Sequence, residues 1–388
     1  MESGPYSGQI LLQAARSLAR QIRAAADEVE GQRRLPDSLV ATLRNAGLYR
    51  MLVPRSVGGF ELTLSEFAEV IEELARADAS AAWCVAQNSG VCGKSGYLPP
   101  KGLREVFGDR DTILSWGHGP TSALKVLGGY RLTGRWIFSS GIRNATWTGA
   151  HNASVVDEGG DPALDESGQP RLISLFFPIE EVELFDVWQV SGLRGTGSDT
   201  YSVTDLFVPD HRVALKEPQE HGTLYRFNTT NMFSVGFAAV ALGVARGAQD
   251  ALLDLAISKS PRGMDSALGN QQYAQIRIAK AEATLRSARD FLFETARRAW
   301  ERVDESGVLE METRINLRLA TTDTIQRCAE VVDNAYHLAG STAILNEKAF
   351  ERRFRDMHAI TQHFQARDDH FQRVGQFMLG QEPDATWL

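Results

Sequence analysis

A glycine-rich stretch near the middle of the chain runs from Trp188 to Val213 and reads WQVSGLRGTGSDTYSVTDLFVPDHRV. Its first half carries three glycines between Gly192 and Gly197, as a dinucleotide-binding loop would. A strand pattern over 201–209 follows these glycines, whereas a dinucleotide-binding loop leads into a helix. From the residues alone, the stretch is therefore interpreted as a glycine-rich turn between two strands.

The elements predicted on either side of this turn are segregated by type. Helical spacing of apolar residues extends from about Gln9 to Phe107. A β region follows, with a hairpin over 128–138 and a strand over 172–178. From about Phe227 to the end the chain is again helical, rich in Ala, Leu and Arg and almost free of proline. Such segregated runs indicate the α+β class, mostly α, and not alternating βαβ units.

Composition excludes several classes of function. The 388 residues are 43% hydrophobic and 23% charged, which is typical of a globular chain with two or three domains. The 41 Lys and Arg residues form no basic block against the 49 Asp and Glu residues, so we expect no nucleic-acid partner. No run reaches the ~18 apolar residues of a membrane span, and the N-terminus lacks a signal-peptide pattern. We therefore expect a cytoplasmic protein with no membrane partner.

A metal site is not expected either. The three cysteines, Cys84, Cys92 and Cys328, fit neither a zinc spacing nor a disulfide framework, and buried thiols are the simpler interpretation. No pair of histidines has the spacing of metal ligands on a helix.

The stretch 188–213 resembles the middle-domain signature of flavoproteins with the acyl-CoA dehydrogenase fold. In that family a Gly-Leu-Arg-Gly-Thr turn leads into a strand that ends in Val-Pro and a charged pair. Further pieces of the chain match the family in the same order, namely residues 43–59, the flavin strand at 134–141, Arg262 and the segment 338–342. The resemblance covers almost the whole chain.

This resemblance implies three domains and a place for a flavin. We expect an N-terminal helical domain over 1–112, a β-barrel-like middle domain over 113–221 and a C-terminal helical bundle over 222–388. The flavin would lie between the β domain and the bundle. Its expected contacts in the β domain are Trp116, His118, Phe138, Ser139 and Ser140.

A neighbouring subunit would complete that flavin site in the family. Arg262, Gly340 and Ser341 fall where the family reaches the neighbour's cofactor. We therefore expect a homo-oligomer, a tetramer. Where this chain has Ala339 and Gly340, the family has two glycines, so Ala339 replaces the first of the pair.

The segment RDMHAITQHFQ, from Arg355 to Gln365, resembles the one that carries the catalytic glutamate of acyl-CoA dehydrogenases. That glutamate removes the α-proton of an acyl-CoA thioester. Gln365 takes its place here and cannot be ionised. The family's other position for the glutamate lies beside Arg262, where Asp265 is the nearest carboxylate. An acyl-CoA dehydrogenase with a relocated base such as Asp265 is therefore the alternative interpretation.

The reduced-flavin-dependent monooxygenases that share the fold match better. The run WIFSSG, from Trp136 to Gly141, resembles their flavin motif, and His363 matches a C-terminal histidine that they place against the substrate. In such enzymes a separate NAD(P)H flavin reductase supplies FADH2 or FMNH2, which reacts with molecular oxygen to form a C4a-hydroperoxide. That intermediate hydroxylates a small phenolic or heteroaromatic substrate, or oxidises a heteroatom.

The resemblance gives each candidate residue a role. Ser140 would hold flavin N5 in a dry site. His363 would deprotonate or orient the substrate, since a histidine with a pKa of ~6.5 accepts a proton at neutral pH. Trp83 and Asn88 would line the substrate side. From the residues alone, each side chain also has a plain structural role, and a flavin-free scaffold is the non-catalytic alternative.

Overall fold

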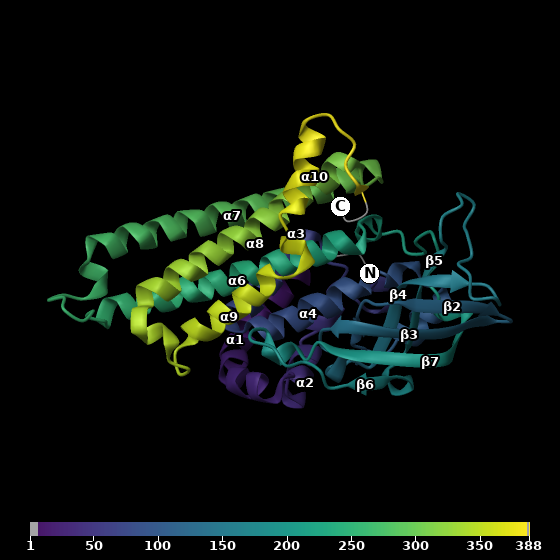
Figure 1. The fold of residues 1–388 in the computed structure, drawn as a ribbon, viewed down its shortest axis with the longest axis horizontal. Helices are drawn as coiled ribbons and strands as arrows, with labels where there is room; N and C mark the ends of the chain where they lie inside the picture. Colours follow the sequence, from purple (N-terminus) through teal and green to yellow (C-terminus); the bar gives the residue numbers. More distant parts are fainter. Residues whose placement is uncertain (1–6, 386–387) are drawn as a thin grey trace.

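The computed structural model describes residues 7–385 and 388. Its elements follow one another in three groups, which are helices α1–α5, strands β1–β7 and helices α6–α10 (Figure 1). The segregated α+β organisation predicted from the sequence is confirmed by this order. The helical bundle of the last group extends away from the sheet, and helix α4 lies where the two meet. The expected domain boundaries, after residues 112 and 221, stay predictions.

One of the N-terminal helices, α4, is buried on nearly every side and packs against α3, the C-terminal helix α6 and strand β1. Helix α3 begins at a capping box, in which Thr63 and Glu66 each satisfy the other's backbone N–H. Asp78 caps α4, and nearly all of α4 is buried, which fits its small and apolar sequence. The helices are α1 (Ser7–Gln32), α2 (Asp37–Asn45), α3 (Leu64–Ala77), α4 (Ala79–Cys92) and α5 (Pro100–Phe107).

The strands form a seven-stranded sheet in the order β1-β4-β2-β3-β7-β6, with β5 paired to β4. The predicted hairpin is the β2–β3 pair, and its turn contains Gly128 at φ 79°. Strand β5 covers the predicted residues, and β7 begins two residues before the predicted start. The bounds are β1 (Leu114–Trp116), β2 (Thr121–Val126), β3 (Gly129–Ser139), β4 (Trp147–Val156), β5 (Leu172–Pro178), β6 (Glu183–Phe185) and β7 (Asp199–Pro209).

Helix α6 is the core of the C-terminal bundle and packs against α3, α4 and α8. By length and composition alone α6 could cross a membrane, whereas no membrane span was expected from the sequence. However, 89% of its apolar window is buried inside the protein, as in the central helix of a bundle. The helices of the bundle are α6 (Thr229–Ser258), α7 (Gln272–Ser306), α8 (Met311–Ala339), α9 (Ala349–Thr361) and α10 (Asp369–Met378).

The two stretches singled out in the sequence, 188–213 and 355–365, contact each other. Helix α9 packs directly on the glycine-rich turn before β7, because a Cβ at Gly192 would overlap the carbonyl oxygen of Arg355. The backbone N–H of Leu193 donates to the buried carboxylate of Asp356 at 2.6 Å. The Arg355 guanidinium donates to the carbonyl of Ser191 at 2.5 Å. The absence of a side chain at Gly192 therefore allows the C-terminal segment to dock on the β domain.

A methyl group at this contact should destabilise the protein. We expect Gly192→Ala to lower the free energy of unfolding by about 1–3 kcal/mol, the usual cost of overpacking a close contact. Gly31→Ala is the matched control, because Gly31 lies within α1 and a Cβ added there would meet no atom within 4 Å. That control should leave the thermal midpoint unchanged or raise it slightly. Equal midpoints for the two variants in circular dichroism would contradict the close approach.

Candidate functional site

Three aromatic rings from separate elements meet between the N-terminal helices and the bundle. Trp83 of α4 stacks on Phe237 of α6, with ring centroids 4.0 Å apart and planes 7° from parallel. The imidazole of His363 meets both rings edge-on, at 5.4 Å from Trp83 and 4.7 Å from Phe237. These three residues are called the aromatic cluster below. Phe237 was not predicted, since nothing distinguishes it from other apolar residues of α6.

His363 does not lie on a helix, which corrects the geometry assumed from the sequence. Helix α9 ends at Thr361, and His363 precedes the short 3-10 helix Phe364–Ala366. There its Nδ1 accepts a hydrogen bond from the backbone N–H of Gln365 at 3.3 Å. A nitrogen that accepts carries no hydrogen, so neutral His363 carries its hydrogen on Nε2.

The surroundings keep His363 uncharged. Burial lowers the pKa of its imidazole to about 3, and the positive charges of Arg318 and Arg367 act in the same direction. His118 and His370 also lie near enough to disfavour the imidazolium. At neutral pH this side chain is therefore a hydrogen-bond donor through Nε2 and is a poor base.

The residue in the place of the dehydrogenase glutamate has a structural role. Gln365 is fully buried, and its Oε1 accepts a hydrogen bond from the buried guanidinium of Arg318. Thr322 Oγ1 donates to the Gln365 carbonyl at 3.1 Å. Asp265, the relocated base of the alternative interpretation, is exposed in the loop between α6 and α7. In this chain neither position places a carboxylate in the aromatic cluster.

A bulge near the end of β3 sets the orientation of the predicted flavin motif. The register with β7 shifts between Trp136 and Ser139, and Phe138 adopts φ 58°. A left-handed conformation is uncommon for a bulky residue, and such strain is typical of functional sites. The Phe138 ring is 57% exposed and stacks on His118 at 5.6 Å. Ser139 is fully buried behind it.

Ser140 begins a chain of buried hydroxyls. Its Oγ accepts from the indole Nε1 of Trp83 at 3.0 Å and lies 2.7 Å from Ser198 Oγ. Ser198 Oγ in turn lies 2.7 Å from Thr196 Oγ1. Ser140, Ser198 and Thr196 are called the hydroxyl chain below. Ser198 and Thr196 were not predicted as site residues from the sequence, although both lie in the glycine-rich turn.

Asn88 contacts the backbone of Ser140. Its amide donates to the carbonyls of Leu114 and Ser140, at 2.9 and 3.4 Å, and Ser115 Oγ donates to the same Ser140 carbonyl at 2.9 Å. Asn88 is 2% exposed. These contacts favour a role in holding the backbone of Ser140 over the predicted contact with substrate, which stays untested.

Trp116 joins the site through a second group of rings. It stacks on His151 of β4, with centroids 4.7 Å apart, and lies 6.4 Å from Phe233, which itself stacks on Phe237. Burial lowers the pKa of His151 to about 3 and Lys94 contributes, while His151 Nδ1 shares a hydrogen bond with Ser174 Oγ. His151 was not identified from the sequence because no neighbouring residue marks it.

The remaining predicted contacts lie at the far end of the bundle. Arg262 is in the loop between α6 and α7, and Gly340 and Ser341 follow α8, in the part of Figure 1 most distant from the sheet. Lys259 joins these two segments by donating to the Ala339 carbonyl and to Thr342 Oγ1. Within one subunit they do not meet Ser140, so their contact with a neighbour's flavin stays a prediction.

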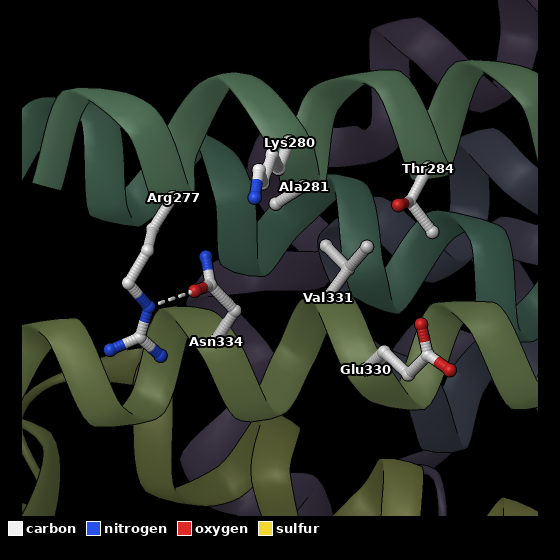
Figure 2. A pocket seen from close by; sticks show the side chains of 7 residues that line it. All are labelled: Arg277, Lys280, Ala281, Thr284, Glu330, Val331 and Asn334. Atoms are coloured by element: carbon white, nitrogen blue, oxygen red, sulfur yellow. Dashed lines mark hydrogen bonds between the residues drawn. The ribbon is translucent and has the colours of Figure 1, made fainter. Parts of the chain in front are cut away.

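A pocket of about 270 Å³ opens between α7 and α8, apart from the aromatic cluster (Figure 2). Arg277 reaches across it, and its Nε donates to Asn334 Oδ1 at 2.8 Å. Lys280 and Glu330 stand on opposite helices of the pocket. None of its lining residues belongs to the predicted site.

The residues of the site fit a reduced flavin. His118 and Phe138 present stacked rings at the surface of the β domain, and Ser140 follows two residues after Phe138, with its backbone N–H donating to the Phe138 carbonyl at 3.1 Å. Ser140 is 5% exposed and its hydroxyl contacts the buried indole of Trp83, which suits the dry site that a protected flavin requires. When bound, reduced flavin would supply the electrons that activate molecular oxygen.

Comparison with known proteins identifies the family. Residues 8–97 match the N-terminal domain of acyl-CoA dehydrogenases, and residues 235–368 match their C-terminal domain. The chain is 32% identical to an indole-3-acetate monooxygenase of Pseudomonas putida over 370 residues, which cover 94% of this chain and 92% of the relative. It is 28% identical to the oxygenase component of an FADH2-dependent resorcinol hydroxylase of a Rhizobium species, with 95% and 94% covered.

A solved structure shares the whole architecture. The HsaA monooxygenase from M. tuberculosis superimposes with a TM-score of 0.88 and 27% identity, covering 98% of this chain and all of the other. The resemblance inferred from the glycine-rich turn and the flavin motif is thereby confirmed. The chain belongs to the flavin-dependent monooxygenases built on the acyl-CoA dehydrogenase fold.

Proposed function

We propose that the protein is the oxygenase component of a two-component monooxygenase, which hydroxylates a small aromatic substrate with reduced flavin and molecular oxygen. The observation that carries this proposal is the position of neutral His363. It contacts Trp83, and Trp83 donates to Ser140. The Trp83 indole thus lies between His363, which is proposed to bind the substrate, and Ser140, which is proposed to bind the flavin. This site lacks the carboxylate that dehydrogenation requires.

The aromatic cluster defines the class of substrate. Trp83 and Phe237 offer flat apolar faces, with which aromatic rings pack in stacked or edge-to-face geometry. A phenol or an indole would place its ring among these walls and its polar atom toward His363. The names of the relatives, which refer to indole-3-acetate and resorcinol, belong to the same chemical class. Oxidation of a nitrogen or sulfur atom is the alternative outcome for a substrate bound in this way.

His363 would orient the substrate by donating from Nε2. Of its two proposed roles, this one agrees with the hydrogen bond that Nδ1 accepts from Gln365 and with the low pKa of the imidazole. A donor at this position also favours the phenolate form of a phenol substrate, whose ring is a better nucleophile than that of the neutral phenol. Arg318 supports the arrangement through Gln365, two residues from His363.

The proposed partners follow from the same assignment. A separate NAD(P)H flavin reductase would supply FADH2 or FMNH2. We propose a homotetramer in which Arg262, Gly340 and Ser341 of one subunit reach the flavin of another, since these residues share the far end of the bundle. We also propose a cytoplasmic location, which agrees with the burial of the apolar helix α6.

The neutral state of His363 predicts a pH dependence of stability. Its folded pKa is lowered to about 3, so below ~6.5 only the unfolded chain binds a proton at this residue. When the pH falls from 7.5 to 5.5, the free energy of unfolding of the wild type should therefore decrease by about 1.4 kcal/mol more than that of His363→Gln. Urea unfolding of both proteins at the two pH values measures this difference. A constant difference would show that His363 protonates in the folded protein.

Replacement of His363 should separate catalysis from cofactor binding. We expect His363→Ala to lower the rate of aromatic hydroxylation at least about tenfold, because the substrate loses its hydrogen-bond donor. Its affinity for reduced flavin should stay that of wild type. His337→Ala, which removes an exposed histidine of α8, is the control and should retain full activity. Unchanged turnover of His363→Ala with phenols and indoles would contradict the assigned role.

A further inference from the structure

The hydroxyl chain has a defined direction. At one end Trp83 Nε1 is a donor only, and it donates to Ser140 Oγ at 3.0 Å. At the other end the carbonyl of Leu193 is an acceptor only, and Thr196 Oγ1 donates to it at 2.9 Å. Between these ends, Ser140, Ser198 and Thr196 are joined by two contacts of 2.7 Å each. All three side chains are buried.

Each hydroxyl has one hydrogen, so only one arrangement makes every bond. Thr196 uses its hydrogen on Leu193, and Ser198 must therefore donate to Thr196. Ser140 must then donate to Ser198. With its hydrogen committed to Ser198 and one lone pair filled by Trp83, Ser140 retains one lone pair. Toward a ligand, Ser140 is an acceptor.

We propose that Ser198 and Thr196 are positioning residues that hold Ser140 as an acceptor and thereby make the site selective for a flavin with hydrogen on N5. Reduced flavin carries that hydrogen, whereas N5 of oxidised flavin has a lone pair and needs a donor. The inference rests on the proposed function, because it takes Ser140 as the residue that meets N5. In this arrangement Ser198 and Thr196 determine the preference for the reduced cofactor without touching the flavin.

The expected size of the preference is modest. The Leu193 carbonyl also accepts from Trp188 Nε1 at 3.1 Å and from the Thr196 backbone N–H at 3.2 Å. Reversing the chain, so that Ser140 donates to oxidised flavin, therefore costs one hydrogen bond and leaves no buried group without a partner. One net hydrogen bond corresponds to about fivefold in affinity.

The test compares the dissociation constants of oxidised and reduced flavin. FMN and FAD are each titrated aerobically, and again after reduction under anaerobic conditions, with the full-length protein. In Ser198→Ala the hydrogen of Ser140 is released and can meet oxidised N5. We expect the ratio of the oxidised to the reduced dissociation constant to fall about fivefold from the wild-type value. Thermal unfolding of each variant verifies that it is folded.

A second pair of variants tests the same direction without touching Ser198. In Thr196→Val, Ser198 loses its acceptor and turns to donate to Ser140, so the ratio should fall as in Ser198→Ala. Thr196→Ser restores a hydroxyl at this position and should restore the wild-type ratio. Ser202→Ala is the matched control, since Ser202 is half-buried on β7 outside the hydroxyl chain. It should leave the ratio unchanged.

The possible failures are distinguishable. A wild-type protein that binds neither flavin in either redox state would overturn the proposed function, and this inference with it. Wild-type binding with an unchanged ratio in Ser198→Ala and Thr196→Val would overturn only the role of the hydroxyl chain. Equal weakening of both redox states would do the same, because it would show that the two residues support the turn without directing Ser140.

Discussion

The docking of helix α9 on the glycine-rich turn is the contact on which the site depends. Gly192 leaves room for the backbone of Arg355, and the buried carboxylate of Asp356 holds the N–H of Leu193. Through this one junction the C-terminal segment, with His363, is fixed against the turn that carries Thr196 and Ser198. Residues more than 160 positions apart in the chain thus converge on Trp83, which touches His363 on one side and Ser140 on the other.

Several independent features keep the imidazoles of this site neutral and a carboxylate out of the position of the dehydrogenase glutamate. Burial lowers the pKa of both His363 and His151 to about 3, so both imidazoles are neutral. At the position of the dehydrogenase glutamate, Gln365 gives the buried Arg318 an uncharged partner. A site without a mobile proton acceptor is poorly suited to removing a proton from an acyl-CoA thioester. It is well suited to a reduced flavin and oxygen, which require a dry environment.

The sequence predicted the architecture well, because the glycine-rich turn and the segregated helices and strands are local patterns. The prediction of a helical chain up to the C-terminus was wrong at His363. Residues 361–365 keep helical composition, but the helix ends at Thr361. Phe237 and the roles of Ser198 and Thr196 could not be predicted. Their function arises from contacts with Trp83 and Ser140, which are far away in the chain, and a hydrogen-bond direction has no signature in a single sequence. The large separation between Arg262, at the far end of the bundle, and Ser140, beside the sheet, also became visible only in the folded chain.

We expect this fold, which has no carboxylate in the aromatic cluster, to insert oxygen into an aromatic ring. The most direct measurement supplies the protein with reduced flavin, isotopically labelled molecular oxygen and a panel of phenols and indoles, and analyses the products by mass spectrometry. We expect one labelled oxygen atom in a hydroxylated aromatic product. Unlabelled aromatics, together with bleaching of bound oxidised flavin by an acyl-CoA, would contradict it and would identify a dehydrogenase.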